Sequence, residues 1–79
     1  MGKVEMQMII INEFGEFIGK KFIVSKEDYD NIIQIARQFY SNGSFDLTCE
    51  DGSFMVFAPE IVQKSILKIK KRIVEDVQE

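Results

Sequence analysis

The sequence predicts a small α+β domain in which two β-hairpins and two helices follow in the order ββαββα, with the hairpins forming an antiparallel sheet. Residues 25–43 have a complete helical pattern, residues 4–11 alternate in polarity, and an Asp-Gly pair separates two further alternating runs. A chain of 79 residues has room for one domain. We therefore expect a single domain over residues 1–79, without a linker and with a frayed C-terminus at about residues 75–79.

The predicted central helix covers residues 25–43. Ser25, with Asp28 three residues later, resembles a capping box, and Gly43 favours the left-handed conformation in which many helices end. Apolar side chains recur at steps of three and four residues and form one stripe, which consists of Tyr29, Ile32, Ile33, Ala36, Phe39 and Tyr40. This stripe needs a cover, for which the predicted sheet offers an apolar face.

The first predicted hairpin begins with a strand at residues 4–11, which is amphipathic at its start and apolar on both faces at its end. Both faces of a strand that is apolar on both sides are expected to be buried. We therefore expect the last helix or a second subunit on the sheet face opposite the central helix. Residues 12–19 are predicted to connect it to a second strand at residues 20–24, with Gly15 in the turn and Gly19 in a bulge.

The second predicted hairpin turns at Asp51 and Gly52, because Asp-Gly between alternating runs is a strong signal for a two-residue loop. Such a loop sets the register: Cys49 faces Phe54, Leu47 faces Val56, and Phe45 lies near Ala58. These side chains form one apolar face for the helix. The opposite face then combines the acids of the first strand with Met55 and Phe57.

Two structures are open for the last segment. Pro59 and Glu60 favour the start of a helix, on which Val62, Ile66, Ile69, Ile73 and Val77 would line one stripe. The alternative is a single helical turn followed by a fifth strand at residues 66–72, because a short apolar run fits either period.

The composition disfavours several classes of function. The formal net charge of −3 gives no general attraction to nucleic acid or to anionic membranes. Cys49 is the single cysteine, so an internal disulfide is excluded and a reducing cytoplasm is the expected location. No apolar run approaches the roughly 18 residues that a membrane helix needs, and the N-terminus lacks the pattern of a signal peptide.

Catalytic equipment is sparse. The chain contains no histidine, which removes the commonest general base and the commonest neutral metal ligand. Cys49 is predicted to be a core residue rather than a nucleophile, and Asp46, Glu50 and Asp51 are expected to be solvated rather than to bind a cation. We therefore expect no enzyme, no metal and no cofactor.

Two groups of side chains are candidates for a binding site. Large apolar groups at a turn or on an outer sheet face often mark interfaces, and four such residues form the predicted partner-binding surface: Phe14, Phe17, Met55 and Phe57. The other candidate is a basic face on the last helix, made of Lys64, Lys68, Lys71 and Arg72.

The favoured function is that of a small non-catalytic cytoplasmic module that binds another protein. Its size suggests an accessory regulator or inhibitor encoded by a phage or other mobile element, and we expect a homodimer. One alternative is a nucleic-acid-binding module that uses the basic face. The other is an oligomeric protein that sequesters a small ligand in a pocket between subunits, walled by Tyr29, Phe39 and Tyr40.

Overall fold

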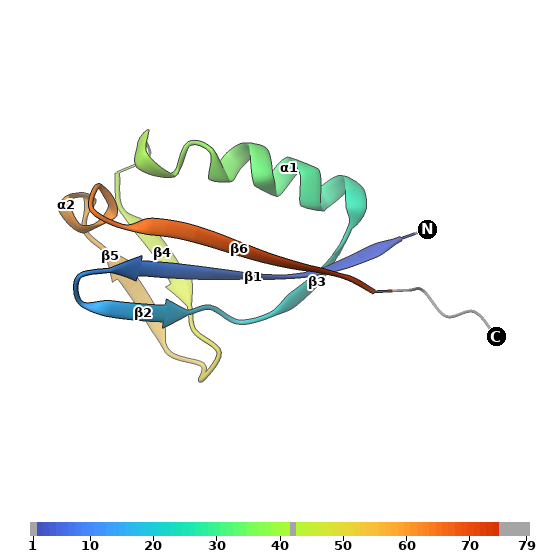
Figure 1. Cartoon of the computed structure of the whole chain (residues 1–79), viewed down its shortest axis with the longest axis horizontal. Coiled ribbons are helices and arrows are strands. Elements are labelled where there is room, and N and C mark those ends of the chain that lie inside the picture. The colour runs from blue at the N-terminus through green and yellow to red at the C-terminus, as the bar shows by residue number, and fades with distance from the viewer. Residues whose placement is uncertain (1, 42, 75–79) are drawn as a thin grey trace.

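The computed structural model describes residues 2–41 and 43–74 and confirms a small α+β domain with antiparallel sheets (Figure 1). The ββαββα order is confirmed only in part, because the last element is a strand. In chain order the elements are β1 (Lys3–Asn12), β2 (Gly15–Ile18), β3 (Phe22–Ser25), α1 (Lys26–Ala36), a 3-10 turn η1 (Phe39–Ser41), β4 (Phe45–Thr48), β5 (Phe54–Phe57), α2 (Pro59–Val62) and β6 (Ile66–Val74).

Strand β1 is the centre of the larger sheet and pairs antiparallel with β6 on one side and with β2 and β3 on the other (Figure 1). Alternate β1 side chains face α1 and the β4–β5 hairpin; we call this the inner face, and it carries Val4, Met6, Met8 and Ile10. The outer face carries Glu5, Gln7, Ile9 and Ile11. Both Ile9 and Ile10 are buried, as expected for the doubly apolar end of this strand.

The connection after β1 is much shorter than the predicted residues 12–19. The Asn12 side-chain carbonyl accepts a hydrogen bond from the Phe14 N–H at 2.8 Å, which closes a tight turn before β2 begins at Gly15. Ile9 pairs with Ile18 and Met6 pairs with Phe22, so three steps along β1 match four steps along the neighbouring edge. The extra residue is the bulge predicted near Gly19, and it divides the edge into β2 and β3.

The predicted register of the second hairpin is wrong by one residue. The Cys49 N–H donates to the Ser53 carbonyl at 2.8 Å, so the loop between them has three residues rather than two. Gly52 has a φ of +93°, as the last position of such a loop requires, and the Asp51 carboxylate accepts a hydrogen bond from the Ser53 N–H at 2.9 Å. The longer loop exchanges the two faces of β5.

The new register turns Met55 and Phe57 inward and Phe54 and Val56 outward. Phe45 pairs with Phe57 and Leu47 pairs with Met55, which gives a hairpin face that packs into the core. The buried core consists of Ile10, Phe39, Leu47, Cys49, Phe57 and Val62. The predicted core position of Cys49 is therefore confirmed.

Helix α1 begins where predicted, since the Ser25 side chain accepts a hydrogen bond from the Asp28 N–H at 3.1 Å. It ends at Ala36, earlier than predicted, and the chain continues through η1 to Gly43, which has a φ of +83°. No α1 side chain is buried. The apolar stripe of the helix is therefore only half covered by this chain.

The last segment follows the strand alternative. Helix α2 is a single turn with Pro59 in its first positions, and β6 then pairs with β1 over nine residues. The predicted long helix is wrong because β1 offers a full-length edge whose hydrogen bonds are satisfied by a strand. Val77 and the predicted fraying at residues 75–79 lie outside the described residues.

Candidate functional site

The outer side of the β4–β5 hairpin is the first candidate binding surface. Phe54 and Val56 lie two positions apart on the same side of β5, and each is 62% exposed. Their cross-strand partners are Thr48 and Asp46. We call these four residues the hairpin face. Large apolar groups next to each other on a strand, with polar groups beside them, are typical of a protein-binding surface.

The four predicted partner-binding residues lie in two different environments. Phe14 is 67% exposed in the β1–β2 turn. Phe17 packs edge-on against Phe57, with ring centroids 5.5 Å apart and an interplanar angle of 69°. Met55 packs against the same core and Phe57 is only 5% exposed. Of the four, Phe14 is therefore the surface residue, and the other three pack in or against the core.

Because residues 66–74 form a strand, the residues of the predicted basic face lie on different sides of the sheet. Lys68 and Arg72 point to the outer face of the sheet together with Lys70, because alternate residues of a strand share a side. Lys71 points to the inner face, where its ammonium group lies 5.0 Å from the centre of the Tyr29 ring. Lys64 precedes the strand. Of the three basic residues on the outer face of β6, the sequence therefore predicted Lys68 and Arg72 and missed Lys70.

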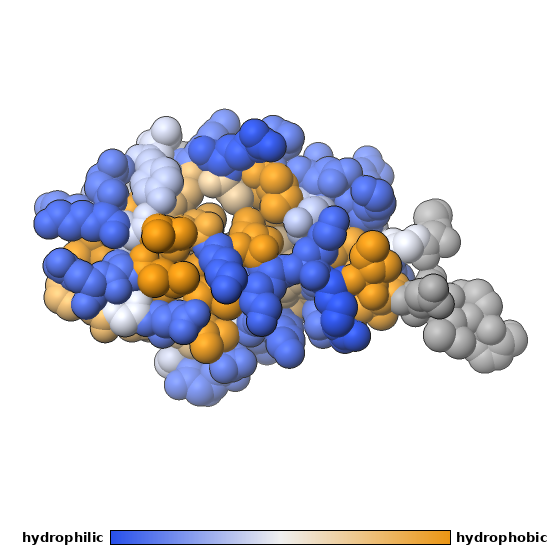
Figure 2. All heavy atoms as spheres, viewed as in Figure 1, coloured by the Kyte–Doolittle hydropathy of each residue, from blue (hydrophilic) through white to orange (hydrophobic). Residues whose placement is uncertain are grey.

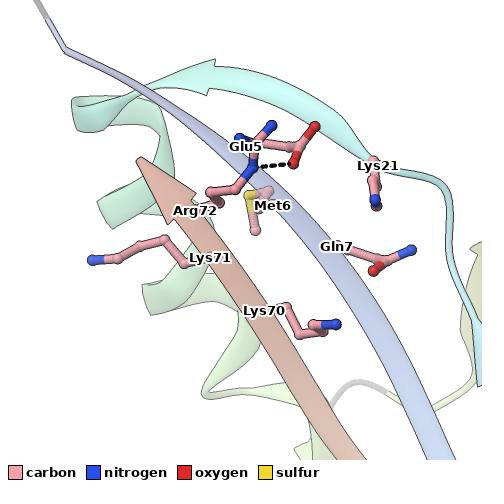
Figure 3. Close-up of a pocket in the computed structure, with 7 residues that line it drawn as sticks. All are labelled: Glu5, Met6, Gln7, Lys21, Lys70, Lys71 and Arg72. Atoms are coloured by element: carbon pink, nitrogen blue, oxygen red, sulfur yellow. Dashed lines mark hydrogen bonds and ion pairs between the residues drawn. The ribbon is translucent and has the colours of Figure 1, made fainter. Parts of the chain in front are cut away.

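A shallow hollow of about 270 Å³ is lined by Lys70 and Arg72 of β6 and by Lys21 (Figure 3). Gln7 projects into the same region, and its side-chain amide donates to the Gly19 carbonyl at 2.9 Å. Lys71 also borders the hollow, while the end of its side chain extends toward α1 and the Tyr29 ring (Figure 3). The hollow is therefore positively charged, except where Glu5 faces Arg72.

Glu5 and Arg72 form an ion pair across the sheet, with 3.0 Å between the Arg72 Nε and the Glu5 Oε1 (Figure 3). The hydrogen bond from the guanidinium group lowers the pKa of Glu5 below its ordinary value, and the nearby Lys21 adds a smaller effect in the same direction. The same hydrogen bond raises the pKa of Arg72. Ionised Glu5 therefore stabilises the folded chain.

The pKa of Glu5 predicts an acid-dependent loss of stability. Because its folded pKa lies below the ordinary value of 4.5, the contribution of Glu5 is complete above that value and is lost as the pH falls through the folded pKa. The Glu5→Gln variant should be less stable than wild type at pH 7 and should lose less stability on acidification. Urea unfolding at pH 7 and pH 3 measures this, with Glu13→Gln in the exposed turn as the control. Equal acid sensitivity of wild type and Glu5→Gln would contradict the prediction.

Asp51, one of the three acids of the second hairpin, is part of the structure of the loop. Asp51 caps the loop by accepting hydrogen bonds from the hydroxyl and the backbone N–H of Ser53, and these bonds lower the pKa of its carboxyl group. Within residues 2–41 and 43–74, no three His, Cys, Asp or Glu side chains are grouped closely enough to hold a metal ion.

The three aromatic residues predicted to line a ligand pocket between subunits lie in two places on this chain. Phe39 is buried and stacks edge-on with Tyr40, and the Tyr40 hydroxyl donates to the Ser65 carbonyl. Tyr29 lies apart from them, under the Lys71 ammonium group. Phe39 instead borders a narrow apolar hollow of about 140 Å³ between α1 and the sheet, together with Met8, Ile32, Ile35, Ala36, Phe45 and Leu67.

The described part of the chain has no helix that is long and apolar enough to cross a membrane. Comparison of the chain with protein-family models, with curated proteins and with solved structures found no match.

Proposed function

We propose that this chain is a small non-catalytic module that acts by binding another protein. The observation that carries the proposal is the hairpin face, on which Phe54 and Val56 are exposed next to each other. Neither side chain belongs to the core cluster. Because each is 62% exposed, their burial by a partner would add about 1–2 kcal/mol each to the driving force for association, before the costs of binding are subtracted.

The hairpin face revises the surface that the sequence predicts. The outward-facing pair of β5 replaces Met55 and Phe57, while Phe14 is retained as a second exposed aromatic group. Asp46 and Thr48 supply the polar groups that orient a partner on a largely apolar patch. The homodimer, the regulatory or inhibitory role, the phage or mobile-element origin and the cytoplasmic location stay predictions.

The proposed function is tested by comparing three tagged forms of the protein in cells of its own host: wild type, the Phe54→Ser/Val56→Ser double variant, and Ile35→Ser. Ile35 is a matched control because it is an equally exposed apolar residue on a different element, α1. We expect a defined partner to be retained by wild type and by Ile35→Ser, and retention to fall at least about tenfold in the double variant.

The hairpin face is rejected as the binding surface if the double variant retains the partner, and the proposed function fails if wild type retains none. All three forms should still unfold cooperatively, since each of these substitutions at an exposed side chain should cost no more than about 1 kcal/mol. That measurement separates a lost contact from a lost fold.

A further inference from the structure

Strand β6 has a free edge. It pairs with β1 over nine residues and with no other strand in the described chain. A free edge presents unpaired backbone N–H and C=O groups, which can bind an additional strand. Four of its nine side chains are lysine or arginine, a composition that protects edges from indiscriminate pairing. Any strand that binds here must therefore accommodate positive charge.

An apolar groove runs beside this edge, between α1 and β6. It has a volume of about 360 Å³ and is bordered by Ile33, Ala36, Arg37, Phe39, Tyr40, Ile66, Leu67 and Ile69. Figure 2 shows the surface hollowed next to α1, with hydrophobic side chains at the margins. The helix has no buried side chain, so its stripe still has apolar area to cover. A strand added to β6 would place its inner-facing side chains in this groove.

The charge pattern of β6 selects the strand that fits. Lys68, Lys70 and Arg72 occupy alternate positions on the outer face, while Leu67 and Ile69 face inward between them. Directly opposed charges of unlike sign stabilise a strand pair, and like charges destabilise it. Arg72 already has Glu5 as a partner, whereas Lys68 and Lys70 form no ion pair within the described residues. The complementary strand therefore has acidic residues on one side and apolar residues on the other.

Self-pairing of two β6 strands does not meet this requirement. A two-fold axis between antiparallel strands keeps the outer faces on the same side, so a pairing centred anywhere from Lys68 to Arg72 places a cation opposite a cation. A second copy of this chain is thus disfavoured at this edge.

We propose that the β6 edge binds an extended segment of another protein, in which acidic and apolar residues alternate, by antiparallel or parallel strand addition. The inference rests on the proposed function, in which the chain binds a protein, but it concerns a surface separate from the hairpin face. The acidic side chains lie opposite Lys68 and Lys70, and the apolar side chains enter the groove beside α1.

The test uses a blocked synthetic peptide of eight residues that alternates glutamate and valine, and a second peptide with lysine in place of glutamate. Nuclear magnetic resonance follows the amide signals and amide hydrogen exchange of the whole chain during titration. We expect saturable binding of the glutamate peptide, with exchange slowed in β6. The Lys68→Glu/Lys70→Glu variant should bind it about tenfold more weakly or worse and should prefer the lysine peptide.

The Lys20→Glu/Lys26→Glu variant is the matched control. It has the same net charge as Lys68→Glu/Lys70→Glu, but both of its substitutions lie away from β6. It should bind the glutamate peptide nearly as well as wild type. The inference is overturned by the absence of saturable binding, by slowed exchange at β5 instead of β6, or by equal weakening in both charge variants. The inference is also overturned if wild type dimerises through β6. The same holds if wild type binds single-stranded oligonucleotide in place of the glutamate peptide.

The two proposals fail separately. Loss of the cellular partner in Phe54→Ser/Val56→Ser with no peptide bound at β6 would retain the proposed function and reject strand addition. Peptide binding at β6 is expected to persist in that double variant, because its two substitutions lie on β5.

Discussion

Phe57→Ala is expected to destabilise the fold by about 3–5 kcal/mol, the usual cost of removing a buried phenylalanine ring. Phe57 is 5% exposed, packs edge-on against Phe17 at 5.5 Å and belongs to the buried core. A domain of 79 residues is stabilised by only about 4–12 kcal/mol in total. The variant should therefore be largely unfolded or lose most of its denaturant resistance. Urea unfolding followed by circular dichroism measures the change.

Phe54→Ala is the matched control for this prediction, because the same ring is removed from the opposite side of the same strand. Phe54 faces solvent, so its loss should cost no more than about 1 kcal/mol. A larger loss of stability in Phe54→Ala than in Phe57→Ala would indicate that Phe54, not Phe57, faces the core. It would contradict the assignment of Phe54 and Val56 to the hairpin face.

Gly19→Ala is expected to destabilise the fold by about 1–3 kcal/mol or more, because an overpacked site must shift its neighbours. A Cβ at Gly19 would lie 2.6 Å from the Met8 carbonyl oxygen and 2.9 Å from the Leu47 Cδ1. The carbonyl belongs to β1 and accepts the Gly19 N–H at 2.8 Å, so it cannot move without breaking the bulge. Gly19 also forms a bridge with Cys49, which joins the two sheets.

Gly2→Ala is the control for the glycine prediction. Among the described residues, no heavy atom beyond Gly2 and its chain neighbours lies within 4 Å of the Cβ that this substitution would add. Its stability should be within about 0.5 kcal/mol of wild type in thermal or urea unfolding. If Gly19→Ala were as stable as Gly2→Ala, the close approach of Gly19 to Met8 and Leu47 would be contradicted.

Local signals in the sequence predicted those parts of the fold that depend on neighbouring residues. The Ser25 cap, the bulge near Gly19 and the inward face of β4 follow from residue type and spacing, and the structure has all three. The Asp-Gly pair correctly predicted a hairpin. It could not fix the loop length, because Asp-Gly is compatible with a two-residue turn and with a three-residue loop that ends in a left-handed glycine.

The identity of the last segment depends on a contact that is remote in sequence. Residues 66–72 fit a helix or a strand, and the decision comes from β1, whose edge lies about 60 residues earlier in the chain. No local pattern encodes that pairing. The same decision changed the basic face, because helical spacing groups Lys68 with Lys71 and Arg72, whereas strand spacing groups it with Lys70 and Arg72.

The sequence predicted an exposed apolar binding surface but assigned most of its residues incorrectly. An excess of large apolar side chains indicated an interface, and Phe14 is exposed as expected. A shift of one residue in β5 then placed Phe54 and Val56, rather than Met55 and Phe57, on the outside. A prediction that had weighed both loop lengths would have produced both sets as candidates.

The most direct test of the hairpin face is a measurement of the β4–β5 register by nuclear Overhauser effects in solution. The Cys49 N–H bonds to the Ser53 carbonyl, so the next pair, Thr48 and Phe54, is a non-hydrogen-bonded pair whose α-protons lie close together. We expect strong α-proton contacts between Thr48 and Phe54 and between Asp46 and Val56. Strong α-proton contacts of Cys49 with Phe54 and of Leu47 with Val56 would instead establish the two-residue loop, return Phe54 and Val56 to the core, and contradict the proposed binding surface.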